Sequence, residues 1–181
     1  MTPGTPARSV GAAAVGVLAL ATLLPGWGRR DLWDPDESRY AWIARDMQLR
    51  RAWLAPELNG VPYTSKPPPF FWLVAATSLL TGRVDTAAPL VSIVAGALTC
   101  ACTFAVGRRL VGPRAALLGA GAFLATVQVL WTLRRGMLDP TLTLASTASV
   151  LALLRATQVV TRFAHDDEWT LVVRVGGGRR P

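Results

Sequence analysis

Five long blocks without a charged residue constrain this chain more than any other feature. The blocks are Ser9–Gly28, Pro67–Gly82, Thr86–Gly107, Ala115–Leu133 and Pro140–Leu154. A helix that crosses a bilayer needs roughly 20 mostly apolar residues, and three of the blocks reach that length while two are shorter. Apolar residues concentrated in this way predict an all-α membrane protein with several spans and argue against a soluble helical domain.

The chain carries a net charge of +8. Its arginines flank the apolar blocks, where membrane proteins keep the charges that orient and anchor their spans. This placement predicts contact with membrane lipids, and no nucleic-acid partner is expected. Cys100 and Cys102 lie inside an apolar block with no metal-ligating residue nearby, so we expect neither a disulfide framework nor a metal site there.

The polar stretch after the first block predicts a helix over Asp34–Arg51. Asp34 suits the N-cap, Pro35 the first helical position, and Glu37 the third. One apolar stripe runs along this helix at helical spacing, formed by Tyr40, Ile43, Ala44 and Met47. With its other faces charged, the helix is expected to lie in the membrane interface rather than to cross it.

The block Pro67–Gly82 leaves the topology open. Its 16 residues rise about 24 Å at 1.5 Å each, which is short of a hydrocarbon core of roughly 30 Å. It is therefore either a second interfacial helix or a short, tilted span.

The distribution of charge favours the interfacial alternative. If Pro67–Gly82 does not cross, Gly107–Arg114, Arg155 and Arg162 lie on the side of the N-terminus, which becomes the positive, cytoplasmic side. The same choice puts Asp139 outside with the first loop. We therefore expect about four transmembrane helices, two interfacial helices, and a first loop that faces outward.

Three acids are candidates for catalysis: Asp36, Glu37 and Asp139. The plain alternative is that they begin helices, because acidic residues in a first turn interact favourably with the helix dipole. The functional alternative is that a carboxylate at the membrane surface acts as a general base or binds a sugar or a metal.

Lys66 is the only lysine in a chain whose 19 basic residues are otherwise arginine. A lysine kept beside a run of prolines suggests that a compact ammonium is needed, for example to hold a phosphate. The alternative is a lysine whose charged end reaches water from a helix end. In the four-span topology Arg134 and Arg135 also lie outside. Binding of a phosphorylated sugar would explain why basic residues occur on that side.

Several motifs resemble the N-terminal part of the polyprenyl-phosphate-dependent glycosyltransferases, which include the lipid A aminoarabinose transferases and the protein O-mannosyltransferases. The motifs are Asp36-Glu37-Ser38-Arg39-Tyr40-Ala41, Trp53 to Gly60, Tyr63 to Pro68, Gly107-Arg108-Arg109-Leu110 and Arg135-Gly136-Met137-Leu138-Asp139. The resemblance implies a GT-C helical bundle and an inverting transfer of sugar from a lipid phosphate at the outer face of the cell membrane. The acceptor, a lipid or a protein, stays open.

The resemblance also implies roles for single residues. Asp36 matches the catalytic carboxylate of the first loop, Glu37 supports it, and Asp139 matches the second acidic position. The residues expected to bind the lipid phosphate are Lys66, Arg39, Tyr63 and Arg135. No cofactor is assigned, although a divalent cation stays possible. Aminoarabinose transferases usually carry glutamate before the lysine, so Ser65 argues against that sugar.

The chain is about a third of the usual family length, which predicts a truncated member. Residues 1–162 are expected to form the N-terminal part of the glycosyltransferase domain, and residues 163–181 a disordered or frame-shifted tail. The alternative to an enzyme is a non-catalytic multi-span protein whose acidic loop binds a partner.

Overall fold

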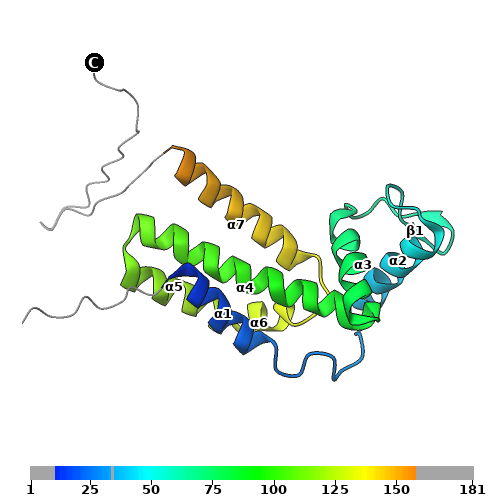
Figure 1. Cartoon of the computed structure of the whole chain (residues 1–181), viewed down its shortest axis with the longest axis horizontal. Coiled ribbons are helices and arrows are strands. Elements are labelled where there is room, and N and C mark those ends of the chain that lie inside the picture. The colour runs from blue at the N-terminus through cyan, green and yellow to red at the C-terminus, as the bar shows by residue number, and fades with distance from the viewer. Residues whose placement is uncertain (1–10, 34, 158–181) are drawn as a thin grey trace, which may run out of the picture.

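The computed structural model describes residues 11–33 and 35–157 and is mostly helical, as predicted (Figure 1). Its elements in chain order are α1 (Ala12–Leu23), α2 (Asp36–Arg50), β1 (Glu57–Leu58), β2 (Val61–Pro62), α3 (Pro69–Thr81), α4 (Val84–Leu110), α5 (Pro113–Ala125), α6 (Val127–Leu133) and α7 (Asp139–Ala156).

Helix α4 is the centre of the bundle. Its 27 residues span about 40 Å, and α1, α5 and α7 pack along it, while α2 and α3 lie together at its N-terminal end (Figure 1). Small residues bring the helices close: a Cβ on Gly107 would meet the Cβ of Ala116 on α5 at 3.0 Å. Such contacts between small residues are typical of packed membrane helices.

Within the described part of the chain, α4 alone is a single helix long and apolar enough to cross a bilayer. Helices α5 and α6 pass the same test only as a pair, bent by 69°, and α1 and α3 are shorter apolar helices of 12 and 13 residues. The expected number of about four spans therefore stays a prediction. The 13-residue length of α3 rises about 20 Å, which leaves the interfacial alternative standing.

The apolar block Ala115–Leu133 forms two helices rather than one. The backbone is extended at Thr126, with φ −66° and ψ 121°, and the helix restarts at Val127 in a new direction. The new direction carries Leu133 onto α4, where its side chain fills the space left by the missing side chain of Gly96.

The predicted first-loop helix is confirmed as α2, which begins two residues later than expected. Pro35 occupies the N-cap position, and Asp34 lies outside the described residues, so its capping role stays a prediction. The apolar stripe is buried against α3, α4 and Leu138, as its spacing predicted. The turn at Asn59-Gly60 is a two-residue hairpin loop with both residues at positive φ.

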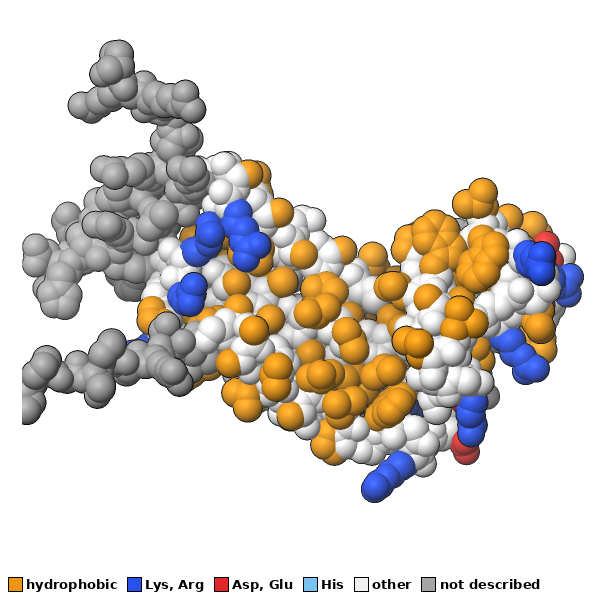
Figure 2. Space-filling model, in the orientation of Figure 1, with side chains coloured by type: hydrophobic (Ala, Val, Ile, Leu, Met, Phe, Trp, Pro, Cys, Tyr) orange, Lys and Arg blue, Asp and Glu red, His pale blue; other side chains and the backbone are white. Residues whose placement is uncertain are grey.

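The two ends of the bundle carry the charges, and the face between them is mainly apolar (Figure 2). At one end Arg109 donates to the backbone oxygen of Leu154 at 3.3 Å, which joins the C-terminal ends of α4 and α7. At the other end the Gly136 N–H donates to Glu37 at 2.8 Å, so the segment that leads to Asp139 lies beside the first loop, as predicted. Arg162 and residues 163–181 lie outside the described residues.

Candidate active site

Glu37 is the anchor of the first loop. Its side chain is fully buried, and its two carboxylate oxygens accept hydrogen bonds from five N–H groups. Arg30 donates twice, at 2.7 Å each, and the Trp33 N–H donates at 2.6 Å. From the segment between α6 and α7, the Gly136 N–H and the Arg135 Nε donate at 2.8 and 3.3 Å. One carboxylate therefore ties together two segments about a hundred residues apart.

The surroundings of Glu37 keep it ionised. Burial by itself would raise the pKa of this carboxyl, but the Arg30 guanidinium and the Trp33 and Gly136 N–H groups outweigh burial and lower it. The same ion pair raises the pKa of Arg30. A carboxylate whose oxygens are occupied in this way is built to hold structure, because a base must have a free oxygen to take a proton.

The segment before Asp139 is fixed against α4 as well. The Ser92 hydroxyl donates to the Met137 oxygen at 2.9 Å and lies 3.1 Å from the Met137 nitrogen. A Cβ on Gly136 would meet the Cβ of Ala88 at 2.9 Å, closer than real Cβ atoms approach, so this position needs glycine. Asp139, at the first turn of α7, thus starts from a rigid support.

Asp36 and Asp139 lie within electrostatic range of a second group, the Tyr40 hydroxyl, and we call Tyr40 and its charged neighbours the tyrosine–carboxylate site. Burial raises the pKa of Tyr40 most, and the charges of Asp36, Tyr63 and Asp139 raise it further, whereas Arg39 lowers it. All four residues are therefore within electrostatic range of one hydroxyl group. Asp36 pairs with Arg39 at 3.3 Å, and its side chain is 40% exposed. Unlike Glu37, Asp36 can reach a substrate.

Aromatic rings hold Tyr40 in place. Its ring lies 5.9 Å from each of Phe70 and Phe71, and Tyr63 packs edge-on against Phe71 at 6.1 Å. These edge-to-face contacts favour one arrangement of the rings. They also fix Tyr63, which enters from the segment that carries Lys66.

Lys66 lies on an exposed loop that lines a pocket of about 510 Å³ together with Tyr63. Arg135 was also expected at the lipid phosphate. It lines a different pocket of about 400 Å³, and Lys66 does not line that pocket. The structure therefore places Asp36, Asp139, Arg39 and Tyr63 within electrostatic range of Tyr40. Tyr63 lines the same pocket as Lys66 and so connects Lys66 to this group. Arg135 lies apart from the group, beside Glu37.

The tyrosine–carboxylate site suits proton transfer next to a phosphate. It offers two carboxylates as possible bases, a protonated tyrosine as a hydrogen-bond donor, and an arginine. Within residues 11–33 and 35–157, no three His, Cys, Asp or Glu side chains lie together as a metal would require.

Three residues of this region escaped the sequence analysis as functional candidates. From the sequence, Tyr40 was identified only as a member of an apolar stripe. Its position one helical turn after Asp36 and Glu37 could have marked it as a candidate site residue. Arg30 and Gly136 carry no sequence signal for their role, because both act by meeting Glu37 across the fold.

Comparisons with known proteins identify the family. Residues 65–177 match the family described as dolichyl-phosphate-mannose-protein mannosyltransferase. The undecaprenyl phosphate-alpha-4-amino-4-deoxy-L-arabinose arabinosyl transferase of Pectobacterium atrosepticum is 36% identical over 137 residues, which cover 75% of this chain and 24% of that protein. The protein of the same name from Pseudomonas savastanoi pv. phaseolicola is 31% identical over 163 residues, covering 90% of this chain and 30% of that protein.

Solved structures give the same result. The crystal structure of ArnT from Cupriavidus metallidurans bound to undecaprenyl phosphate superposes with a TM-score of 0.70 at 27% identity, covering 87% of this chain and 27% of that one. The chain thus spans about a quarter of the length of the relatives it matches. The match over most of its residues leads to one conclusion: the chain belongs to the dolichyl-phosphate-mannose-protein mannosyltransferase family of membrane glycosyltransferases.

Proposed function

We propose that this chain carries the catalytic carboxylates of a multi-pass membrane glycosyltransferase that takes a sugar from a polyprenyl phosphate. The observation that carries the proposal is that the segment leading to Asp139 is bonded to the first loop, through the Gly136 N–H and Glu37 at 2.8 Å, so that Asp36 and Asp139, 103 positions apart in sequence, both lie within electrostatic range of the Tyr40 hydroxyl.

In this mechanism Asp36 is the general base. It accepts the proton of the acceptor hydroxyl while the acceptor oxygen forms a bond to the anomeric carbon of the sugar. The bond from that carbon to the phosphate oxygen breaks on the opposite face, and the polyprenyl phosphate leaves with the electron pair. Attack opposite the leaving group inverts the anomeric carbon. Asp139 and the protonated Tyr40 orient the reacting groups.

Lys66, Arg39 and Tyr63 are proposed to bind the lipid phosphate. The Lys66 ammonium has no ion-pair partner among the described residues, so it is available to a phosphate. Arg39 reaches the site beside Asp36, and Tyr63 connects the Lys66 loop to Tyr40. A negative charge on the leaving phosphate is thereby balanced by two cations.

Glu37 has a supporting role in this proposal, and Arg135 acts through it rather than on the phosphate. Because Glu37 is buried, the acidic set is not available as one exposed partner-binding loop, which weakens the non-catalytic alternative. The site is proposed to face outward, with about four spans in the chain. The relatives are named for 4-amino-4-deoxy-L-arabinose, whereas Ser65 precedes Lys66 here, so the proposal specifies neither the donor sugar nor whether the acceptor is a lipid or a protein.

The test is transfer of a labelled sugar from polyprenyl-phosphate donors by membranes that contain the chain. Asp36→Asn is expected to lower the rate by about 100-fold or more, the usual contribution of a general base. Asp46→Asn is the matched control, because Asp46 lies on the same helix but pairs with Arg50. A wild-type chain that transfers no sugar from any polyprenyl-phosphate donor, or an Asp36→Asn variant as active as wild type, would refute the proposal.

A further inference from the structure

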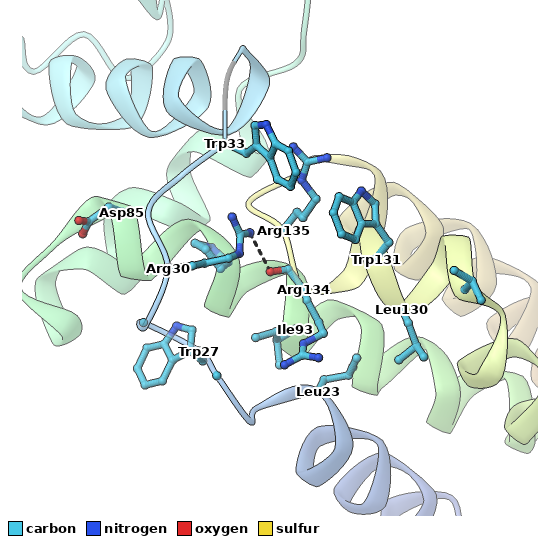
Figure 3. A pocket seen from close by; sticks show the side chains of 14 residues that line it. Leu23, Trp27, Arg30, Trp33, Asp85, Ile93, Leu130, Trp131, Arg134 and Arg135 are labelled. Carbon is cyan, nitrogen blue, oxygen red and sulfur yellow. Dashed lines mark hydrogen bonds between the residues drawn. The ribbon is translucent and has the colours of Figure 1, made fainter.

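A second pocket lies on the other side of the Glu37 anchor and takes no part in the proposed chemistry. It has a volume of about 400 Å³ and lies between the end of α1, the start of α4 and helix α6 (Figure 3). Its lining divides into two kinds of side chain. One set is apolar and includes Leu23, Ile93, Val127 and Leu130, and the other set combines three arginines with three tryptophans.

The three arginines give this pocket a positive charge that the described residues only partly neutralise. Arg30 is occupied by Glu37, but Arg135 donates to Glu37 only through Nε. Arg134 donates through one terminal nitrogen to the Pro25 oxygen. The terminal amino groups of Arg135, together with the Nε and the other terminal nitrogen of Arg134, have no hydrogen-bond acceptor in the described part of the chain.

The one acid that lines this pocket does not supply the missing charge. Asp85 accepts a hydrogen bond from the Arg83 Nε at 3.0 Å and forms an ion pair with a terminal nitrogen of the same guanidinium. Asp85 therefore already has its own cation, and among the described residues the pocket keeps an excess of positive charge.

Tryptophans form the walls beside these cations. The Arg135 guanidinium carbon lies 5.3 Å from the Trp33 ring and 5.4 Å from the Trp131 ring, which contact each other edge-to-face (Figure 3). Trp27 is fixed by a 2.8 Å bond from its Nε1 to the Thr86 oxygen at the start of α4. Tryptophan is enriched where a membrane meets water, and these rings lie at the end of the apolar helix α4.

We infer that this pocket binds the phosphate of an anionic glycerophospholipid from the surrounding membrane. The free N–H groups of Arg134 and Arg135 bind the phosphate oxygens in the paired geometry that guanidinium groups favour. One acyl chain follows the apolar lining toward Val127, which is 82% exposed and offers a surface for it. Basic pockets between membrane helices are suited to such head groups.

A lipid explains the whole lining better than a soluble anion does. A free phosphate would use the arginines but would leave the apolar set and the exposed Val127 without a partner. The volume of about 400 Å³ accommodates a head group and the first carbons of a chain, and the rest of the lipid would lie against α6. Asp36, Asp139 and Lys66 do not line this pocket, so the inference does not depend on the proposed function.

The test uses the full chain in nanodiscs of phosphatidylcholine that contain a minority of phosphatidylglycerol with the same acyl chains. Native mass spectrometry measures which lipid the protein retains after release. Wild type is expected to retain phosphatidylglycerol selectively. Arg134→Gln is expected to lower that retention about tenfold, the effect of one lost charge-assisted hydrogen bond to phosphate. Arg134→Lys, which keeps the cation, should retain more lipid than Arg134→Gln.

Two control variants show whether lipid retention depends on this pocket rather than on the overall charge of the protein or on catalysis. Arg108→Gln removes an arginine at the opposite end of α4 and should leave retention unchanged. Asp36→Asn should also retain the lipid, even where sugar transfer is lost. Equal retention of both lipids by wild type, or equal losses in Arg134→Gln and Arg108→Gln, would overturn the inference. Displacement of the lipid by inorganic phosphate would show a free-anion site instead, and selective retention of added polyprenyl phosphate would assign the pocket to the donor; either result overturns it.

Discussion

Replacing Glu37 with glutamine tests the structural anchor directly. The variant keeps the size of the side chain but removes its charge and turns one acceptor into a donor. Five N–H groups now point at Glu37, so at least one of them would face another donor in a buried space. Removing one partner of a buried ion pair costs about 3–5 kcal/mol. Because the Arg30 side chain is 39% exposed and can regain water, we expect the lower end, about 3 kcal/mol.

The assay is unfolding of the purified chain in detergent, followed by helical circular dichroism, together with hydrogen exchange. Glu37→Gln should unfold at a clearly lower temperature, and the peptide around Gly136 should exchange faster because its N–H loses an ionised acceptor. Asp46→Asn is the control, since its i,i+4 pair with Arg50, whose side chain is 55% exposed, contributes less than about 1 kcal/mol. If Glu37→Gln costs no more than Asp46→Asn, or leaves exchange at Gly136 unchanged, the anchor assigned here is wrong.

Two further predictions concern the same anchor. The pKa of Glu37 is lowered in the folded state, so its contribution to stability is complete above the unfolded value of about 4.3 and is lost as the pH falls through the lower folded value. Unfolding temperatures from pH 7 to pH 3 should therefore drop below about pH 4 in wild type and much less in Glu37→Gln, and parallel curves would contradict this. Gly136→Ala should destabilise the chain by about 1–3 kcal/mol, because the new methyl group would lie 2.9 Å from the Cβ of Ala88. Gly119→Ala, whose Cβ would meet nothing within 4 Å, should be neutral or stabilising in the same unfolding assay, and equal effects of the two substitutions would count against the close contact.

Features that depend on local sequence could be predicted. The helix α2 follows from a proline start and an apolar stripe, because both are set by neighbours along the chain. The break at Thr126 could not be predicted, since no proline or glycine marks it. It is fixed by the packing of Leu133 on Gly96, a contact between residues far apart in sequence.

In the candidate site, too, some features could be predicted from the sequence and others could not. A charge count over whole loops predicted Asp139 beside the first loop, and the bond from the Gly136 N–H to Glu37 places the segment before Asp139 there. The different environments of Asp36 and Glu37 could not be read from the sequence, where they are simply two adjacent acids. Each helical residue is turned about 100° from the last, so neighbours point to different surroundings. Asp36 therefore faces Tyr40, and Glu37 faces the segment that leads to α7.

The burial of Glu37 and the pocket beside it account for three arginines that the charge pattern alone left unexplained. Arg30, Arg134 and Arg135 lie at the same end as the first loop, and the positive-inside tendency would keep that end poor in basic residues if it faces outward as proposed. Two of them neutralise Glu37, a carboxylate that could not be buried without cations. Arg134 does not contact Glu37, yet it lines the pocket beside Trp131, and two of its three nitrogens have no acceptor among the described residues. A bound lipid phosphate supplies the reason for this third arginine, so its loss should affect lipid retention much more than folding.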